Sequence, residues 1–347
     1  MKELDSIAEV EAALRAEGFF EGGADGLVAD VYLGYRLSDG LRRTEVPAPA
    51  EPINLPAAAL RVRDAHEPVP QAGSFAVGPW ARSWSEEEYG AAIEDVKDSI
   101  GAGDVYQVNL VQHLSASFRG DPAGLGARLA ALSPQHPRPL LGDGWAIVSA
   151  SPELFLARRG RRVWTMPIKG TRPRGVDGLV ESEKDAAEHV MIVDLERNDL
   201  SRVCLSGSVN WPELMEPRGL AGVEHLVSRV EGTLREDVTL TELLGAMFPG
   251  GSVTGAPKIA ALDLIAELEP VGRGASMGAL GVVYPNGDLD LALTIRTFAL
   301  SEGRIHLWVG GGIVWDSDPE AEIEESWVKA RPLLKAIGAP LPEPVLL

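Results

Sequence analysis

The sequence predicts an α+β fold in which antiparallel sheets dominate and helices come in blocks. Successive strand-like runs are separated by short turns such as "YPNGD" and "SEGR", and turns this short join antiparallel neighbours. The helical patterns are grouped and do not alternate with single strands, as they would in a parallel α/β sheet. Beyond residue 80 the chain has neither an internal repeat nor a clean linker. Most of the chain is therefore expected to form one domain.

The N-terminal part, residues 1–83, is expected to be a strand-and-loop portion packed on the same domain. Its start, "MKELDSIAEVEAALRAEG", has the pattern of an amphipathic acidic helix. Strands are expected at residues 26–37 and 60–63. The Pro-rich stretch "VPAPAEPINLP" between them is typical of a loop.

The main part, residues 84–338, has the clearer pattern. Ser85 can cap a helix over residues 86–100, and a Gly-Ala-Gly-Asp turn then leads into an alternating strand over residues 105–118. Further helices are expected at residues 123–132, 181–195, 240–247, 256–267 and 319–334. Further strands are expected at residues 145–149, 154–158, 162–168, 208–211, 227–234, 278–284, 289–299 and 304–309.

Composition narrows the class of protein. The 347 residues are 45% hydrophobic and 24% charged, which is ordinary for a globular protein, and the formal net charge of −19 argues against a nucleic-acid binder. No apolar run is long enough to span a membrane, and the start lacks the basic and apolar regions of a signal peptide. Cys204 is the single cysteine, so a disulfide within the chain and a multi-thiolate metal site are excluded. These features favour a cytoplasmic enzyme.

Two pairs of carboxylates have helical spacing. Asp185 and Glu188 lie three residues apart in "KDAAEHVMIVDLERNDL", and Glu322 and Glu325 repeat the spacing in "DPEAEIEESWVKA", with Lys329 one turn further on. Residues three apart share one helix face. Two helices that each present such a pair could hold Mg²⁺, which takes one or two carboxylates and leaves its other positions to water and substrate. Each pair alone is also compatible with a solvated helix face.

Three glycine-rich segments could bring backbone close to a ligand: "FPGGSVTGAPK", "VGGGIVWDSDPE" and the "KGT" of "MPIKGTRPRG". None matches a nucleotide-binding fingerprint, so tight turns and helix caps are the alternative. Lys169 follows an apolar run over residues 163–168. It is either a solvated loop lysine or a nucleophile or anion ligand. Arg296, in the apolar run "LALTIRTFAL", either points to solvent or meets a carboxylate, and His225 could be structural.

Eight of these segments, in order, resemble the chorismate-utilising enzymes. They are "AGDVYQVNL", "SPELF", "PIKGTRPRG", "EHVMIVDLERNDLSRVC", "EHLVSRVEG", "FPGGSVTGAPK", "LTIRT" and "GGGIVWDSDPEAEIEESWVKA", and they span about residues 84–335. The resemblance implies a large sandwich of antiparallel sheets with helices packed outside. It also implies a Mg²⁺–chorismate site in a cleft, and a first portion (residues 1–83) that is shorter than in relatives.

Two positions narrow the reaction that the resemblance implies. Relatives that add water at C2 of chorismate carry a lysine base where this chain has Gln107, and an amide cannot take a proton from water. Anthranilate synthases usually read "PIAGT" where this chain has Lys169. A lysine there is similar to the aminodeoxychorismate synthase branch. That branch uses ammonia to aminate chorismate at C4, giving 4-amino-4-deoxychorismate on the p-aminobenzoate and folate route.

The resemblance also implies roles for individual residues. Lys169 would be the nucleophile at C2, and Glu153 the general acid that protonates the departing C4 hydroxyl. Glu188 and Glu325 would bind Mg²⁺ directly, with Asp185 and Glu322 acting through water. The remaining substrate-binding positions would be Gln107, Gly170, Thr171, His225, Ser252, Arg296, Gly312 and Lys329.

Some features depart from the family or leave alternatives open. Ser276 stands where relatives often have a substrate-contacting tyrosine, and Cys204 does not sit in a glutaminase-like turn. A separate glutamine amidotransferase subunit is therefore expected to supply ammonia. The alternatives are an anthranilate synthase or another aminating chorismate enzyme of secondary metabolism, in which Lys169 only binds an anion. A third is a catalytically weak subunit that binds chorismate or a partner.

Overall fold

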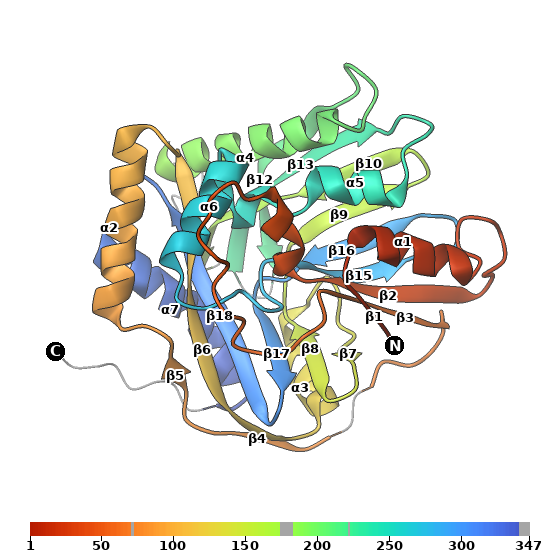
Figure 1. Ribbon diagram of the computed structural model, residues 1–347, viewed down its shortest axis with the longest axis horizontal. Helices are drawn as coiled ribbons and strands as arrows, with labels where there is room; N and C mark the ends of the chain where they lie inside the picture. The colour runs from red at the N-terminus through yellow and green to blue at the C-terminus, as the bar shows by residue number, and fades with distance from the viewer. Residues whose placement is uncertain (71–72, 174–182, 221–222, 340–347) are drawn as a thin grey trace.

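Two antiparallel sheets face each other across the main hydrophobic core of the computed structural model (Figure 1). The structure describes residues 1–70, 73–173, 183–220 and 223–339. Buried residues of both sheets meet in this core, for example Val31 and Leu291 of one sheet and Ile147 and Trp308 of the other. The predicted α+β fold with a sandwich of antiparallel sheets is confirmed.

The larger sheet has the described strand order β1-β3-β2-β15-β16-β9-β10-β13-β11, with β12 paired to β13. Its strands are β1 (Lys2–Leu4), β2 (Leu27–Leu33), β3 (Ala58–Asp64), β9 (Leu154–Arg159), β10 (Arg162–Met166), β11 (Ile168–Pro173), β12 (Asn210–Leu220), β13 (Val223–Thr233), β15 (Ala279–Val283) and β16 (Leu289–Leu293). N-terminal strands β2 and β3 thus share a sheet with strands from the second half of the chain, because β2 pairs with β15.

The smaller sheet has the described order β14-β6-β18-β17-β8-β7, with β4 and β5 paired to β6. Its strands are β4 (Phe75–Val77), β5 (Ala81–Arg82), β6 (Gln107–Gly120), β7 (Leu140–Leu141), β8 (Trp145–Ser149), β14 (Gly255–Ala256), β17 (Thr297–Ser301) and β18 (Arg304–Ile313). The two long strands, β6 and β18, run antiparallel, with Gly312 opposite Asn109.

Helices cover the outer sides of the sheets. Helix α4 packs on β13, and α1 packs on α5 and β3 (Figure 1). Helix α7 packs on β18 and against α2, and a second apolar cluster fills the space between the smaller sheet and helices α3 and α7. The helices are α1 (Ile7–Ala16), α2 (Glu86–Ala102), α3 (Pro122–Leu129), α4 (Glu183–Ser201), α5 (Leu240–Met247), α6 (Lys258–Leu268) and α7 (Pro319–Ala336). Within the described ranges, no helix combines the length and the apolar character that a membrane span requires.

Local chemistry explains the best-predicted boundaries. Ser85 accepts the backbone N–H of Glu88, and the Glu88 carboxylate accepts the backbone N–H of Ser85, so a capping box starts α2 as expected. The helix ends at Gly103, whose φ of 86° is easily adopted only by glycine.

Several predicted elements were wrong in part, including the strand expected over residues 208–211, which is β12 (Asn210–Leu220). The run expected as one strand over residues 289–299 is two strands, β16 and β17, which lie in different sheets. The strand expected over residues 162–168 breaks at Pro167, which has no N–H for the ladder. The strand expected over residues 26–37 stops at Leu33, and Tyr35–Leu41 forms a 3₁₀ helix. Residues 2–4 pair with β3 as an edge strand and do not start the first helix.

Candidate active site

The glycine run at the end of β18 brings the side chains of several elements together. A Cβ atom placed on Gly312 would lie 2.6 Å from Gln107 Nε2 and 3.2 Å from Lys169 Nζ. A Cβ atom placed on Gly311 would lie 3.4 Å from side-chain atoms of Glu322, Glu325 and Lys329. Residues from β6, β11 and α7 therefore gather around one short stretch of backbone, and the missing side chains of the two glycines let them approach it closely.

Lys169 pairs with Glu188 across the contact between β11 and α4. The Nζ atom lies 3.2 Å from Glu188 Oε2, and the two side chains are 16% and 13% exposed. A solvated loop lysine would be far more exposed, so that alternative is wrong for Lys169. The pair places a potential nucleophile next to a carboxylate that was predicted as a metal ligand.

Glu153 is a buried carboxyl group, 5% exposed, at the start of β9. Ser252 donates a hydrogen bond from Oγ to Glu153 Oε1 at 2.9 Å. Burial raises the pKa of Glu153 to about 7, although the Ser252 hydrogen bond and the positive charges of Lys169 and Arg296 act in the opposite direction. The group is therefore substantially protonated near neutral pH and can donate a proton.

Arg296 lies in the connection between β16 and β17 and not inside a strand. Its backbone has a φ of 50°, an unusual value for a residue with a side chain, and its carbonyl accepts the N–H of Ala150. Burial lowers the pKa of Arg296, and the charge of Glu153 opposes this shift. The charges of Arg296 and Glu153 therefore act on each other, which favours the carboxylate alternative over the solvent alternative.

Gln107 is fully buried at the start of β6, and neither polar atom of its amide has a hydrogen-bond partner among the described residues. An unpartnered buried amide is costly, and this one lies against Gly312 and Lys169. The arrangement is suited to a polar ligand that would complete its hydrogen bonds.

The acidic pair of α7 faces the glycine run. Lys329 Nζ lies 2.7 Å from Glu325 Oε1 and donates to the carbonyl of Gly310 at 2.8 Å. Glu322 is buried and accepts a hydrogen bond from Ser317. The solvated-face alternative is therefore wrong for Glu322, whereas Glu325 is half-exposed. Among the residues with described side chains, no cluster of three potential ligands holds a preformed metal site.

Several predicted site residues lie wholly or partly outside the described residues. The side chains of Thr171, Asp185 and His225 are not described, so their predicted roles stay predictions. The backbone places Thr171 directly opposite His225 in the β11–β13 ladder. Gly170 lies in β11 with a φ of 61°. Ser276 is buried, and its hydroxyl lies 3.5 Å from the carbonyl oxygen of Thr294.

Two buried polar residues of α4 were not singled out from the sequence. Glu196 accepts the backbone N–H of Gly251 at 3.0 Å, and burial raises its pKa to about 8. His189 is fully buried beside Glu188, and burial, with the positive charge of Lys169, lowers its pKa to about 4. Both residues lie in the quoted stretch "EHVMIVDLERNDL". The eight-residue spacing from Glu188 to Glu196 places the two glutamates near the same face of a helix, and this spacing was the signal that the sequence offered.

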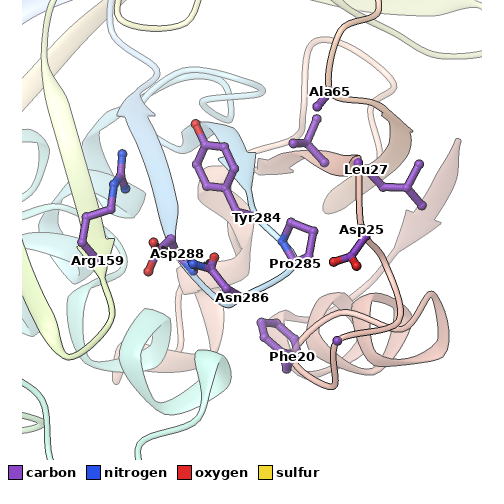
Figure 2. A pocket seen from close by; sticks show the side chains of 12 residues that line it. Phe20, Asp25, Leu27, Ala65, Arg159, Tyr284, Pro285, Asn286 and Asp288 are labelled. Atoms are coloured by element: carbon purple, nitrogen blue, oxygen red, sulfur yellow. Dashed lines mark hydrogen bonds between the residues drawn. The ribbon is translucent and has the colours of Figure 1, made fainter.

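A separate open hollow of about 920 Å³ lies at the far end of the β15–β16 hairpin (Figure 2). Phe20, Asp25, Arg159, Tyr284 and Asp288 are among its lining residues, and none of the predicted site residues belongs to them. Of its polar groups, Arg159 is paired with Asp290, and Asp288 accepts the N–H of Gly160. This hollow is therefore not the predicted site.

Comparison with known proteins agrees with this arrangement. Residues 37–335 match the family described as chorismate binding enzyme. The chain is 45% identical over 264 residues to anthranilate synthase component 1 of Thermus thermophilus, covering 73% of this chain and 57% of the relative. It is 41% identical over 279 residues to aminodeoxychorismate synthase component 1 of Escherichia coli, covering 77% and 61%. The chain thus spans about 60% of the length of these relatives.

The fold is shared with solved structures of the same group. The crystal structure of anthranilate synthase component I from Streptococcus pneumoniae superposes with a TM-score of 0.75 at 28% identity, covering 89% of this chain and 80% of that one. The family resemblance seen in the sequence is confirmed. Relatives with two different activities in their names have similar identity, so identity alone does not assign the reaction.

Proposed function

Because the chain belongs to the chorismate binding enzyme family, we propose that it is the synthase component of an aminodeoxychorismate synthase. It would combine chorismate with ammonia and give 4-amino-4-deoxychorismate and water. The observation that carries the proposal is the position of Lys169. Its amine lies among Gln107, Gly312 and Glu188, where a nucleophile would meet a substrate ring.

The proposed reaction has two displacements. The uncharged amine of Lys169 attacks C2, both conjugated ring double bonds shift by one position toward C4, and the C4–O bond breaks as Glu153 donates its proton, so that water leaves. Ammonia then attacks C4, both double bonds shift back, and the C2–N bond breaks to return the Lys169 amine. The ammonium formed at C4 supplies the proton that restores Glu153. The enolpyruvyl ether is retained throughout.

The surroundings of Glu153 support its role as the acid. A carboxyl group with a pKa of about 7 is a better proton donor at neutral pH than an ordinary glutamate, which is fully ionised there. Ser252 fixes the orientation of the carboxyl through its hydrogen bond. Arg296, close enough to interact with Glu153, is the candidate to bind a substrate carboxylate.

We also propose that Glu188 and Glu325 bind Mg²⁺, with Asp185 and Glu322 acting through water. The donor set suits a hard cation, because Glu188 and Glu325 offer carboxylate oxygens from two helices, α4 and α7. Each of the two direct ligands lies next to a lysine ammonium, Lys169 for Glu188 and Lys329 for Glu325. When bound, Mg²⁺ would neutralise the ring carboxylate of chorismate.

The ammonia source is proposed to be a separate glutamine amidotransferase subunit. Glutaminase chemistry needs a reactive thiolate, and burial raises the pKa of the Cys204 thiol to about 11. The relatives are named as component 1 of their synthases, which fits a partner subunit. Free ammonium should replace that partner in the test tube.

The second candidate is anthranilate synthase, the name carried by the Thermus thermophilus relative that is 45% identical to this chain. In that reaction C2 is aminated and pyruvate is eliminated, so Lys169 would only bind an anion. The third, a chorismate-binding subunit without turnover, has less support because Lys169, Glu322 and Glu325 lie around the glycine run and the charge of Lys169 acts on the buried Glu153.

A product assay distinguishes the candidates. The purified chain would be incubated with chorismate, Mg²⁺ and ammonium, and the products resolved by chromatography with mass detection. A product that keeps the enolpyruvyl group, and yields p-aminobenzoate when a lyase is added, supports C4 amination. Fluorescent anthranilate with released pyruvate would replace it with the second candidate. No product at all, with chorismate still bound, would favour the third.

A further inference from the structure

The turn that carries Ser252 is held in place by α4. Ser252 lies in a 3₁₀ turn, Gly251–Val253, and its hydroxyl bonds Glu153. One residue earlier, the backbone N–H of Gly251 donates to Glu196 Oε1 at 3.0 Å. A Cβ atom on Gly251 would lie 2.5 Å from Leu195 Cδ2, so the turn approaches the helix closely.

Glu196 has few other contacts that would explain a buried carboxyl group. The residue is 2% exposed, and its Oε2 atom has no hydrogen-bond partner among the described residues. The charged groups that act on it are Asp199, Lys258 and Glu153. Asp199 and Lys258 pair with each other at 2.5 Å, and Lys258 also donates to the carbonyl of Pro249, at the start of the same turn. Burying a carboxyl group without full pairing costs free energy. The hydrogen bond from the Gly251 N–H to Glu196 offsets part of that cost.

We propose that Glu196 is a positioning residue that acts through the Gly251–Ser252 turn to hold the Ser252 hydroxyl on Glu153. The inference rests on the proposed function, because it assigns Glu153 the role of acid. Glu196 does not touch the substrate in this scheme. Burial raises its pKa to about 8, so near pH 7 its carboxyl is mostly neutral and glutamine is its closest mimic.

The test compares Glu196→Gln with Glu196→Met. Glutamine keeps an oxygen that can accept the Gly251 N–H, whereas methionine fills a similar volume without one. We expect Glu196→Met to lower kcat roughly tenfold, the cost of one misplaced hydrogen bond, with KM changed less than about twofold. Glu196→Gln should stay within about threefold of the wild type.

Two further measurements separate positioning from a general loss of stability. In a double-mutant cycle with Ser252→Ala, the kcat penalty of Glu196→Met should shrink below about twofold, because the two changes act on one contact. The matched control is Glu11→Met. Glu11 is also buried and accepts the backbone N–H of another helix residue, Thr241, at 2.7 Å. Glu11→Met should lower the melting temperature, while its kcat stays within about twofold of the wild type.

Hydrogen exchange keeps the inference testable if the proposed reaction fails. Amide exchange of the segment around Gly251 should be at least about tenfold faster in Glu196→Met than in Glu196→Gln, and unchanged in Glu11→Met. If this faster exchange were found but the chain did not aminate chorismate at C4, the proposed function would be wrong and the role of Glu196 in holding the turn would stand. Additive kcat penalties in the cycle, or equal exchange in the two Glu196 variants, would overturn the positioning role.

Discussion

Lys169 Nζ lies 3.2 Å from Glu188 Oε2, and both side chains are largely shielded from solvent. One contact therefore joins the proposed nucleophile to a proposed metal ligand. The effect of a variant that removes one of these charges is therefore ambiguous, because the other charge is left partly buried and unpaired. Variants at these positions have to separate charge from chemistry.

Lys169→Arg makes that separation. Arginine keeps the positive charge beside Glu188, but its guanidinium cannot be deprotonated and cannot attack carbon. We expect Lys169→Arg and Lys169→Met both to lower kcat by at least about 10³-fold, as expected for a lost nucleophile. Chorismate binding, measured by equilibrium titration, should persist in Lys169→Arg. If that variant kept more than a tenth of the activity, Lys169 would be a binding residue only.

Metal binding is tested with Glu188→Gln and Glu325→Gln. Each should raise the Mg²⁺ concentration for half-maximal activity by roughly tenfold or more, because a carboxylate ligand is lost. Mn²⁺ binding followed by electron paramagnetic resonance gives a second readout. Glu324→Gln is the matched control, since Glu324 lies on the same helix but pairs with Arg331 at the surface. Unchanged metal dependence in both Gln variants would contradict the assignment.

The acid role of Glu153 predicts the shape of the pH profile. The raised pKa of about 7 means that the proton is present at lower pH and is lost as the pH rises through that value. We expect kcat to fall above about pH 7, and Glu153→Gln to lower kcat on the order of 10²-fold and to remove this limb. Ser252→Ala removes a hydrogen bond that lowers the Glu153 pKa, so in this variant the fall of kcat should begin at a higher pH. A limb that stays in Glu153→Gln would belong to another group.

Elements with a local chemical signal could be predicted from the sequence. The capping box at Ser85 and the long strand β6 appear with boundaries close to those expected. The break between β16 and β17 could not be predicted, because an apolar alternating run looks the same whether the strand stays in one sheet or crosses to another. The positive φ of Arg296 belongs to that crossing.

The candidate site divides in the same way. Glu153, Lys169 and Glu188 were predicted from family motifs, and the fold brings Lys169 to Glu188 from β11 and α4. Glu196 was missed, because a glutamate among charged helix residues is usually solvated. Its burial depends on the Gly251 turn, which lies 55 residues further along the chain.

Replacement by alanine is expected to have a different effect at each glycine of the β18 run. In Gly310→Ala the Cβ would lie 1.9 Å from the backbone oxygen of Leu110, so we expect a loss of about 3 kcal/mol or more in stability. In Gly312→Ala it would displace the Gln107 amide, so kcat/KM should fall on the order of 10²-fold with the fold retained. Gly311→Ala makes only ordinary contacts and should change stability by less than about 1 kcal/mol. Chemical denaturation measures the loss of stability, and steady-state kinetics measure kcat/KM. A larger stability loss in Gly312→Ala than in Gly310→Ala would contradict the geometry.

Buried histidines of the smaller sheet predict acid sensitivity. His113 Nδ1 lies 2.5 Å from Ser83 Oγ, and His113 Nε2 lies 2.9 Å from His306 Nδ1. Burial lowers the pKa of His113 to about 3 and that of His306 to about 4. A pKa lowered by folding gives stability that is present above the unfolded value near 6.5 and is lost as the pH falls toward the folded value.

The variant His113→Gln/His306→Gln removes both titrating groups and keeps polar side chains. Between pH 7 and pH 5 we expect the wild type to lose roughly 4 kcal/mol more free energy of unfolding than this variant, because at pH 5 both rings take up a proton in the unfolded state and neither does so in the folded state. Denaturant unfolding at the two pH values measures the difference. The exposed His66→Gln should behave like the wild type. Equal pH slopes in the double variant and the wild type would mean that the pair takes up protons equally in the folded and unfolded states and does not drive acid unfolding.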